Sequence, residues 1–221
     1  MSRRFAAVLF DLDGTLIDSA RDLAGAANEM RLARSLPPLP FDTLRPLAGA
    51  GARGMIGVAL GIAPGDAEYD SLRDEFLDRY EQRMLAETHV FEAMEAVIDR
   101  LDQTDWPWGI VTNKVQRFTL PVVEGLRLHR RAAVVVSGDT TPHTKPHPEP
   151  LLEASRRLGV RPEGCVYVGD DLRDVQAGRA AGMVTAVAGW GYLGTGDAVA
   201  AWGADVVVGS PSLLLNWLGL A

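Results

Sequence analysis

Residues 5–15 read FAAVLFDLDGT, an unbroken apolar run that ends at the carboxylates of Asp11 and Asp13. A short run without polar alternation is typical of a strand buried on both faces of a parallel sheet. Similar runs are WGIVT at 108–112, AAVVVS at 132–137 and CVYVG at 165–169, with weaker candidates at 184–188 and 205–208. Helical patterns separate these runs at 115–126, 148–158 and 172–181. Strands that alternate with helices predict an α/β fold with a doubly wound, Rossmann-like parallel sheet.

A block without strand patterns interrupts this alternation after the first strand. Helical patterns fill it at 19–32, 41–47, 52–60 and 66–84, with proline- and glycine-containing breaks between them. We therefore expect two domains. Residues 1–17 and 86–221 would form the α/β core, and residues 18–85 a helical cap over the sheet edge where ligands bind.

The composition excludes several kinds of partner. A net charge of −7 disfavours nucleic acid, because a phosphate backbone needs a basic surface. No apolar run approaches the roughly 20 residues of a membrane span, so we expect no membrane partner. The single cysteine, Cys165, suits a reducing compartment and predicts a cytoplasmic protein. Both a monomer and a homodimer are compatible with these features.

Four polar segments follow the ends of predicted strands. They are DLDGT at 11–15, VTN at 111–113, KP at 145–146 and GDDLRD at 169–174. The carboxyl ends of parallel strands meet at one edge, so these carboxylates, a hydroxyl and an ammonium group should converge. Clustered carboxylates need a cation between them, and all-oxygen ligands beside a phosphate favour Mg²⁺. Only Lys114 and Lys145 among the 22 basic residues are lysines, which hints that a compact ammonium is needed there.

In this order and at these separations, the four segments resemble the motifs of the haloacid dehalogenase superfamily. The resemblance covers essentially the whole chain, and the helical block lies where that family's α-helical C1 cap is inserted. It implies a Mg²⁺-dependent phosphatase that hydrolyses a small phosphomonoester through an aspartyl-phosphate intermediate. An acid at position 13 favours this branch, since a phosphatase must protonate an alkoxide and activate water, whereas dehalogenases of the superfamily need no such group.

Within that branch the chain is similar to phosphoglycolate phosphatases and to N-acetylmuramic acid 6-phosphate phosphatases. Segments 49–53, 108–114 and 202–208 are similar to the second group in particular. The substrate implied is therefore 2-phosphoglycolate or a sugar phosphate such as N-acetylmuramic acid 6-phosphate. The resemblance points to no partner other than a small phosphorylated metabolite.

The resemblance also implies roles for individual residues. Asp11 would be the nucleophile, Asp13 the acid and then the base, and Thr112 and Lys145 would complete the catalytic set. The Mg²⁺ site would be formed by Asp11, Asp13 through its carbonyl, Asp170 and Asp174. Asp174 would act through water or from behind the direct ligands. The substrate-binding residues would be Thr112, Asn113, Lys114, Arg53 and Lys145. The role of Asp171 stays open, because relatives often have serine there.

Other interpretations remain open at this point. A phosphosugar mutase would share the cap and the chemistry, and the sequence does not show whether water reaches the intermediate. A phospho-receiver domain is also phosphorylated on aspartate, but its acidic pair comes early and it has no place for the cap.

Some of the singled-out residues also have purely structural interpretations. Asp170 and Asp171 could cap the following helix, Lys114 and Asp174 could be surface charges, and Arg53 could merely begin a helix. Two GxGxxG segments, 49–54 and 189–194, lack the strand–turn–helix context of nicotinamide binding. The glycines of the first would nevertheless let cap backbone approach a ligand.

Overall fold

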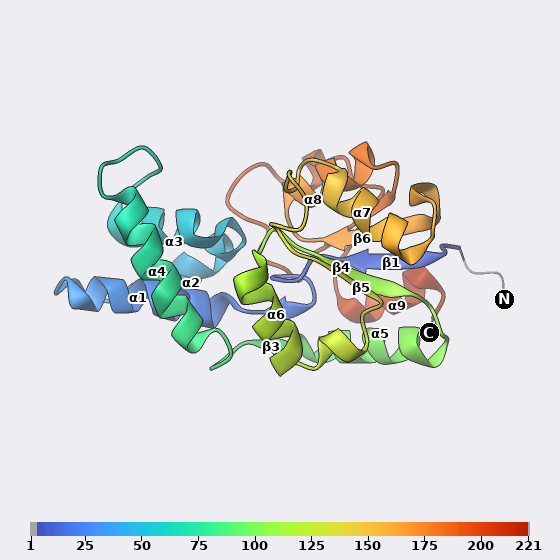
Figure 1. The fold of residues 1–221 in the computed structure, drawn as a ribbon, viewed down its shortest axis with the longest axis horizontal. Coiled ribbons are helices and arrows are strands. Elements are labelled where there is room, and N and C mark those ends of the chain that lie inside the picture. The colour runs from blue at the N-terminus through green and yellow to red at the C-terminus, as the bar shows by residue number, and fades with distance from the viewer. Residues whose placement is uncertain (1–3, 221) are drawn as a thin grey trace.

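Six parallel strands form the central sheet, in the order β5-β4-β1-β6-β7-β8 (Figure 1). The computed structural model describes residues 4–220. The strands are β1 (Ala7–Phe10), β4 (Trp108–Val111), β5 (Val134–Val136), β6 (Cys165–Gly169), β7 (Val184–Ala188) and β8 (Val206–Val208). Each strand predicted from an apolar run is confirmed, with ends shortened by two residues at most. The strand order reverses between β1 and β6, so a ligand site is expected at the carboxyl ends of these two strands.

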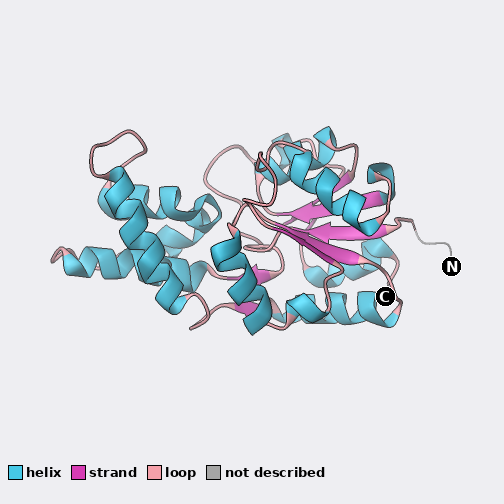
Figure 2. Cartoon of the chain, viewed as in Figure 1, coloured by secondary structure: helices cyan, strands magenta, loops and turns pink. Residues whose placement is uncertain are grey.

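Helices cover both faces of the sheet (Figure 2), as a doubly wound fold requires. Val8 and Phe10 of β1 pack with α5 (Glu92–Gln103) and α9 (Pro211–Leu218) on one face. Ala7 and Leu9 pack with α7 (Glu149–Leu158) and α8 (Leu172–Ala180) on the other. Single 3₁₀ turns at Leu128–Arg130, Pro162–Gly164 and Val199–Ala201 complete this part. Within residues 4–220, no helix has the length and apolar character that a membrane span requires.

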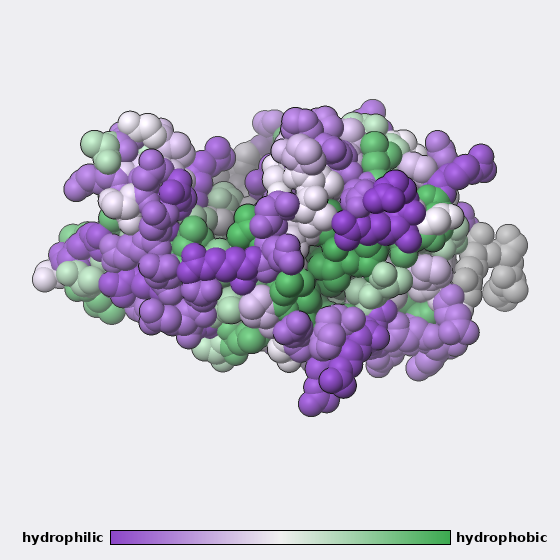
Figure 3. Space-filling model, viewed as in Figure 1, coloured by the Kyte–Doolittle hydropathy of each residue, from purple (hydrophilic) through white to green (hydrophobic). Residues whose placement is uncertain are grey.

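The helical block has a hydrophobic core of its own. It consists of α1 (Ala20–Ala33), α2 (Phe41–Leu44), the 3₁₀ segment η1 (Arg45–Ala50), α3 (Gly51–Leu60) and α4 (Tyr69–Arg83). Met30, Met55 and Phe76 lie at its centre, joined by Phe118 from α6 (Gln116–Gly125). In the space-filling view, hydrophilic side chains cover most of the visible face of α4, and hydrophobic atoms show between this block and the sheet (Figure 3). We keep the name cap for this block; its exact limits, residues 18–85, stay a prediction.

Two short strands, which the sequence patterns did not predict, mark where the chain crosses between core and cap. β2 (Ile17–Asp18) pairs antiparallel with β3 (His89–Val90), so the two crossings lie side by side. Asp22, fully buried in α1, strengthens this junction. Its Oδ2 accepts hydrogen bonds from the N–H groups of Glu87 (3.0 Å) and Thr88 (2.9 Å) and from the Thr88 hydroxyl (2.8 Å). Nε of Arg83 lies 3.6 Å from the other oxygen of Asp22.

Candidate active site

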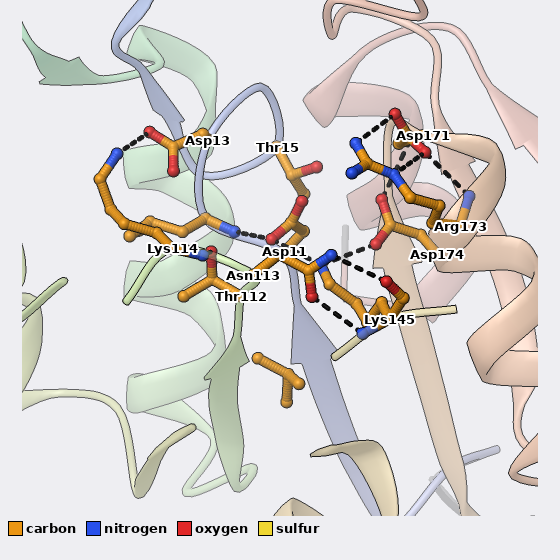
Figure 4. A network of polar contacts seen from close by, with 12 residues as sticks. Asp11, Asp13, Thr15, Thr112, Asn113, Lys114, Lys145, Asp171, Arg173 and Asp174 are labelled. Carbon is orange, nitrogen blue, oxygen red and sulfur yellow. Dashed lines mark hydrogen bonds and ion pairs between the residues drawn. The ribbon is translucent and has the colours of Figure 1, made fainter. Parts of the chain in front are cut away.

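A cavity of about 330 Å³ lies between the strand ends and the cap. All four polar segments contribute to its wall, since Asp11, Thr112, Lys145 and Asp170 line it together. Asp13, Asn113, Lys114 and Asp174 line it as well. The structure therefore gathers these predicted residues, which are separated by up to about 160 positions in sequence, at one sheet edge. Figure 4 shows Asp11, Thr112 and Lys145 among them. Arg53 is different: its side chain is exposed on α3 and is not among the lining residues.

Three acids form a cluster on the floor of the cavity. Asp11, Asp170 and Asp174 each offer a carboxylate oxygen, and these oxygens lie within 4.8 Å of one another. Three carboxylates beside the single ammonium of Lys145 leave a formal charge of −2. Burial, opposed in part by Lys145, raises the pKa of Asp11 to about 7. An oxygen-only site with this excess negative charge fits a hard divalent cation such as Mg²⁺.

Lys145 lies between two of these acids and is held by several contacts. Its Nζ lies 2.8 Å from Oδ1 of Asp11, 2.8 Å from Oδ1 of Asp174 and 2.9 Å from the Tyr167 hydroxyl. Burial alone would lower the pKa of Lys145, but the two acids outweigh it and raise the pKa. The Asn113 amide holds the Lys145 backbone by two hydrogen bonds of 2.9 Å, one to its N–H and one to its carbonyl. Both ends of the Asn113 amide are thus used to position Lys145.

Asp170 is held by two residues that the sequence did not single out. The Thr15 hydroxyl donates to its Oδ1 (2.9 Å), and the backbone N–H of Tyr192 donates to its Oδ2 (2.8 Å). Burial, and then the neighbouring charges of Asp11 and Asp174, raise the pKa of Asp170 well above its ordinary value. Gly14 permits this close packing, because a Cβ there would lie 2.2 Å from Oδ2 of Asp170 and its φ of +84° disfavours other residues.

Asp13 stands apart from the three clustered acids, on the side of the cavity that faces the cap. Its Oδ1 accepts hydrogen bonds from Lys114 Nζ (2.7 Å) and from the Ser19 hydroxyl at the start of α1. The Lys114 ammonium also lies 4.9 Å from the ring centre of Tyr80 in α4. Burial would lower the pKa of Lys114, but Asp13 and Tyr80 together raise it, so this lysine stays charged. The surface-charge interpretation of Lys114 is therefore wrong.

Asp171 caps helix α8, one of the two interpretations that the sequence left open. Its Oδ1 accepts the backbone N–H of Arg173 (2.8 Å), and Asp174 reciprocates by accepting the N–H of Asp171 (3.0 Å). The Arg173 guanidinium pairs with both oxygens of Asp171, at 2.8 Å each. Burial raises the pKa of Asp171, but these contacts with Arg173 lower it overall.

Several residues of the site were missed at the level of sequence. Thr15 and Arg173 lie inside the quoted segments DLDGT and GDDLRD, so their position was a usable signal. Tyr167 occupies an apolar strand and Tyr192 a loop, and neither carries a local signal. Thr112 was predicted, and its buried hydroxyl lines the cavity while accepting the N–H of Lys114 (3.1 Å).

Comparison with known proteins agrees with this geometry. Residues 8–188 match the family model of haloacid dehalogenase-like hydrolases, and the chain belongs to that family. The chain is 39% identical over 218 residues to an N-acetylmuramic acid 6-phosphate phosphatase of Pseudomonas aeruginosa, covering 99% of this chain and 96% of the relative. It is 44% identical over 208 residues to a phosphoglycolate phosphatase of Xanthomonas campestris, covering 94% of each.

The fold is also shared with solved structures. A crystal structure described as a predicted phosphoglycolate phosphatase from Haemophilus somnus superposes with a TM-score of 0.84 and 22% identity. The superposition covers 97% of this chain and 98% of that one. The resemblance inferred from the four segments is confirmed, and so is the enzyme class that it implied: the chain is a phosphoric monoester hydrolase.

Proposed function

We propose that this enzyme hydrolyses a small phosphomonoester with the help of Mg²⁺, through a phosphoryl group carried transiently on Asp11. The observation that supports this most directly is the placement of Asp11. It lies at a strand end on the cavity floor, salt-bridged to Lys145 and clustered with Asp170 and Asp174. A carboxylate can attack phosphorus only where the charge of both reactants is screened.

Mg²⁺ would be held by Asp11, Asp170, Asp174 and the carbonyl of Asp13, and when bound it would offset the charge of the phosphoryl oxygens. The remaining steps belong to the protein. Asp11 attacks phosphorus and the ester oxygen leaves as an alkoxide, which Asp13 protonates. Asp13 then takes a proton from water, and that water releases inorganic phosphate from Asp11. Thr112 and Lys114 line the same wall and would donate to the phosphoryl oxygens.

The contacts of Asp13 suit this double role. Lys114 and Ser19 both bond to Oδ1, whereas Oδ2 makes no hydrogen bond to a described residue. One oxygen thus fixes the side chain and the other is available for proton transfer. Lys145 has a different task, since its three N–H groups are engaged by Asp11, Asp174 and Tyr167. It would chiefly orient the nucleophile and reduce its charge.

The substrate would be 2-phosphoglycolate or a sugar phosphate such as N-acetylmuramic acid 6-phosphate, the compounds on which the named relatives act. The cap supplies the wall that faces the leaving group, through Leu23, Phe76 and Tyr80 and through backbone at 48–52. A cavity of about 330 Å³ has room for a leaving group larger than glycolate. A reducing compartment such as the cytoplasm would suit the single, buried Cys165.

Release of inorganic phosphate from a panel containing both compounds tests the proposal. We expect one of them to be turned over far faster, and Asp11→Asn to abolish turnover without changing the folded state. Asp13→Asn should lower turnover strongly, because it removes both the acid that protonates the alkoxide and the base that activates water. Full activity of Asp11→Asn would refute the assignment. Transfer of phosphate between sugar hydroxyls, in place of its release, would indicate a mutase.

A further inference from the structure

Arg45 and Arg173 each bridge cap and core beside the acid cluster. Arg45, the first residue of η1 in the cap, donates to the carbonyls of Trp190 and Gly191 in the core, at 3.2 Å each. Arg173, in α8 of the core, donates to the carbonyl of Gly49 in the cap at 2.7 Å. The donor lies in the cap in the first case and in the core in the second, but both contacts involve the same cap segment, η1.

Each bridge continues to a group that fixes one of the clustered acids. The loop held by Arg45 continues into Tyr192, whose ring lies 5.3 Å from the Arg45 guanidinium and whose N–H donates to Asp170. The same loop is anchored through Trp190, whose indole N–H donates to the carbonyl of Thr15 (3.1 Å). Thr15 in turn donates to Asp170.

The second bridge reaches Asp174. Arg173 binds both carboxylate oxygens of Asp171, and Asp171 shares the capping box of α8 with Asp174. Gly49 contacts the guanidinium from the cap side. Movement of η1 away from the core would therefore break the hydrogen bond from Arg173 to the Gly49 carbonyl. The Arg173 guanidinium would then be held only by its two bonds to Asp171.

Arg117 of α6 also joins the two parts, through Asp78 and Glu81 of α4, but its side chain is exposed and does not line the cavity. Two further arginines make similar bonds within one part of the molecule. Arg179, six residues along α8 from Arg173, donates to the Gly203 carbonyl of the core (3.0 Å). Arg31 in the cap donates to the carbonyl of Pro37 (2.7 Å). Substitution of either residue is therefore a control that removes an arginine and its hydrogen bond without removing a contact between cap and core.

We propose that Arg45 and Arg173 are positioning residues that couple closure of the cap to the alignment of Asp170 and Asp174. Neither needs to touch the substrate. With the cap closed, Arg45 supports the groups that fix Asp170, and Arg173 supports those that fix Asp174. With the cap open, both acids are held less rigidly. The inference rests on the proposed function in one respect, the assignment of these acids as Mg²⁺ ligands.

The experiment measures cap position independently of turnover. Spin labels are attached to Leu32→Cys in the cap and Leu152→Cys in the core, both exposed positions in helices, in a Cys165→Ala background. Pulsed electron resonance then gives the distribution of cap–core distances, with and without Mg²⁺ and inorganic phosphate. The variants are Arg45→Gln and Arg173→Gln, with Arg31→Gln and Arg179→Gln as matched controls. Arg173→Lys is added because lysine keeps the charge but cannot bridge two acceptors with a planar fork.

Loss of a charge-assisted hydrogen bond predicts an increase of about tenfold in the ratio of open to closed molecules for both bridge variants. Mg²⁺ binding measured by calorimetry should weaken by a similar factor, because coupling between closure and binding is reciprocal. Arg173→Lys should resemble Arg173→Gln, and the controls should match the unmodified chain. Unchanged distances in both bridge variants, equal changes in the controls, or altered distances with unchanged Mg²⁺ affinity would each overturn the coupling. Absence of turnover on every ester, with the distances changing as expected, would instead count against the proposed function.

Discussion

Tyr167→Phe is the most informative single change in the site, because it removes one oxygen atom and leaves the ring in place. The hydroxyl accepts a hydrogen bond from Lys145 Nζ (2.9 Å) and donates to the carbonyl of Val111 (2.8 Å). Burial and the nearby charge of Asp174 raise the pKa of Tyr167 well above its ordinary value, so the group stays a neutral phenol. Its neighbours are buried, and water cannot easily replace it.

The magnitude follows from the two shorter bonds that are lost; the third contact of the hydroxyl, with Oδ1 of Asp174, is longer at 3.2 Å. Removing the donor to a buried carbonyl costs about 1–3 kcal/mol, and a bond to a charged group contributes about 1.5–3 kcal/mol. Because phenylalanine leaves no cavity, and because Lys145 keeps Asp11 and Asp174, we expect the free energy of unfolding to fall by about 2–4 kcal/mol. Lys145 would also orient Asp11 less tightly, so the turnover number should fall about tenfold.

Urea denaturation followed by circular dichroism measures the first quantity, and steady-state phosphate release the second. Tyr69→Phe in cap helix α4 is the matched control, since that ring lies outside the cavity wall. We expect the control to stay within about 0.5 kcal/mol of the unmodified chain. A Tyr167→Phe protein with unchanged stability and unchanged turnover would show that the hydroxyl does not support Lys145.

Thr15→Val removes the hydroxyl that donates to Asp170, and calorimetry should show Mg²⁺ binding about tenfold weaker; equal affinity would contradict that contact. Chelation of Mg²⁺ should abolish turnover and added Mg²⁺ should restore it, so activity that survives chelation would argue against the metal site. In the metal-free protein the pKa of Asp11 is about 7, against about 4 in an unfolded chain. Only the folded state holds this proton between those values, so the free energy of unfolding should decrease as pH rises through that range, and Asp11→Asn should flatten the profile. Asp22→Ala leaves Arg83 and two linker N–H groups without their buried partner, which should cost about 3–5 kcal/mol in urea denaturation; Glu29→Ala, at the exposed end of the same arginine, should cost less than about 1 kcal/mol.

The sheet and the catalytic floor were predictable because their signals are local. A strand buried on both faces must be continuously apolar, and the acids at its end cannot lie elsewhere in a parallel sheet. Helices α5 and α9 could also have been predicted from the sequence. Met94, Val97, Ile98 and Leu101 repeat with helical spacing in α5, and Ser210 caps α9, so both helices carry a local signal.

The contacts that orient the acids could not be predicted, because they join residues far apart in the chain. Nothing in the local sequence distinguishes Tyr167 from other strand residues, because its role depends on the contact with Lys145. The two-residue strands β2 and β3 are too short for a periodic pattern and exist only through their pairing. The exposed position of Arg53 on α3 likewise depends on how the cap helices pack, which the local sequence does not fix.

The pairing of β2 with β3 makes the cap, in topological terms, the enlarged loop of a β-hairpin. Ile17 lies opposite Val90, and antiparallel partners place their Cα atoms about 5 Å apart. A tight turn could therefore join the two strands directly, and the parallel sheet would keep every strand order and register that it has now. Nature could exchange one cap for another at this junction without redesigning the phosphate-handling floor beneath it, and an engineer could attempt the same graft.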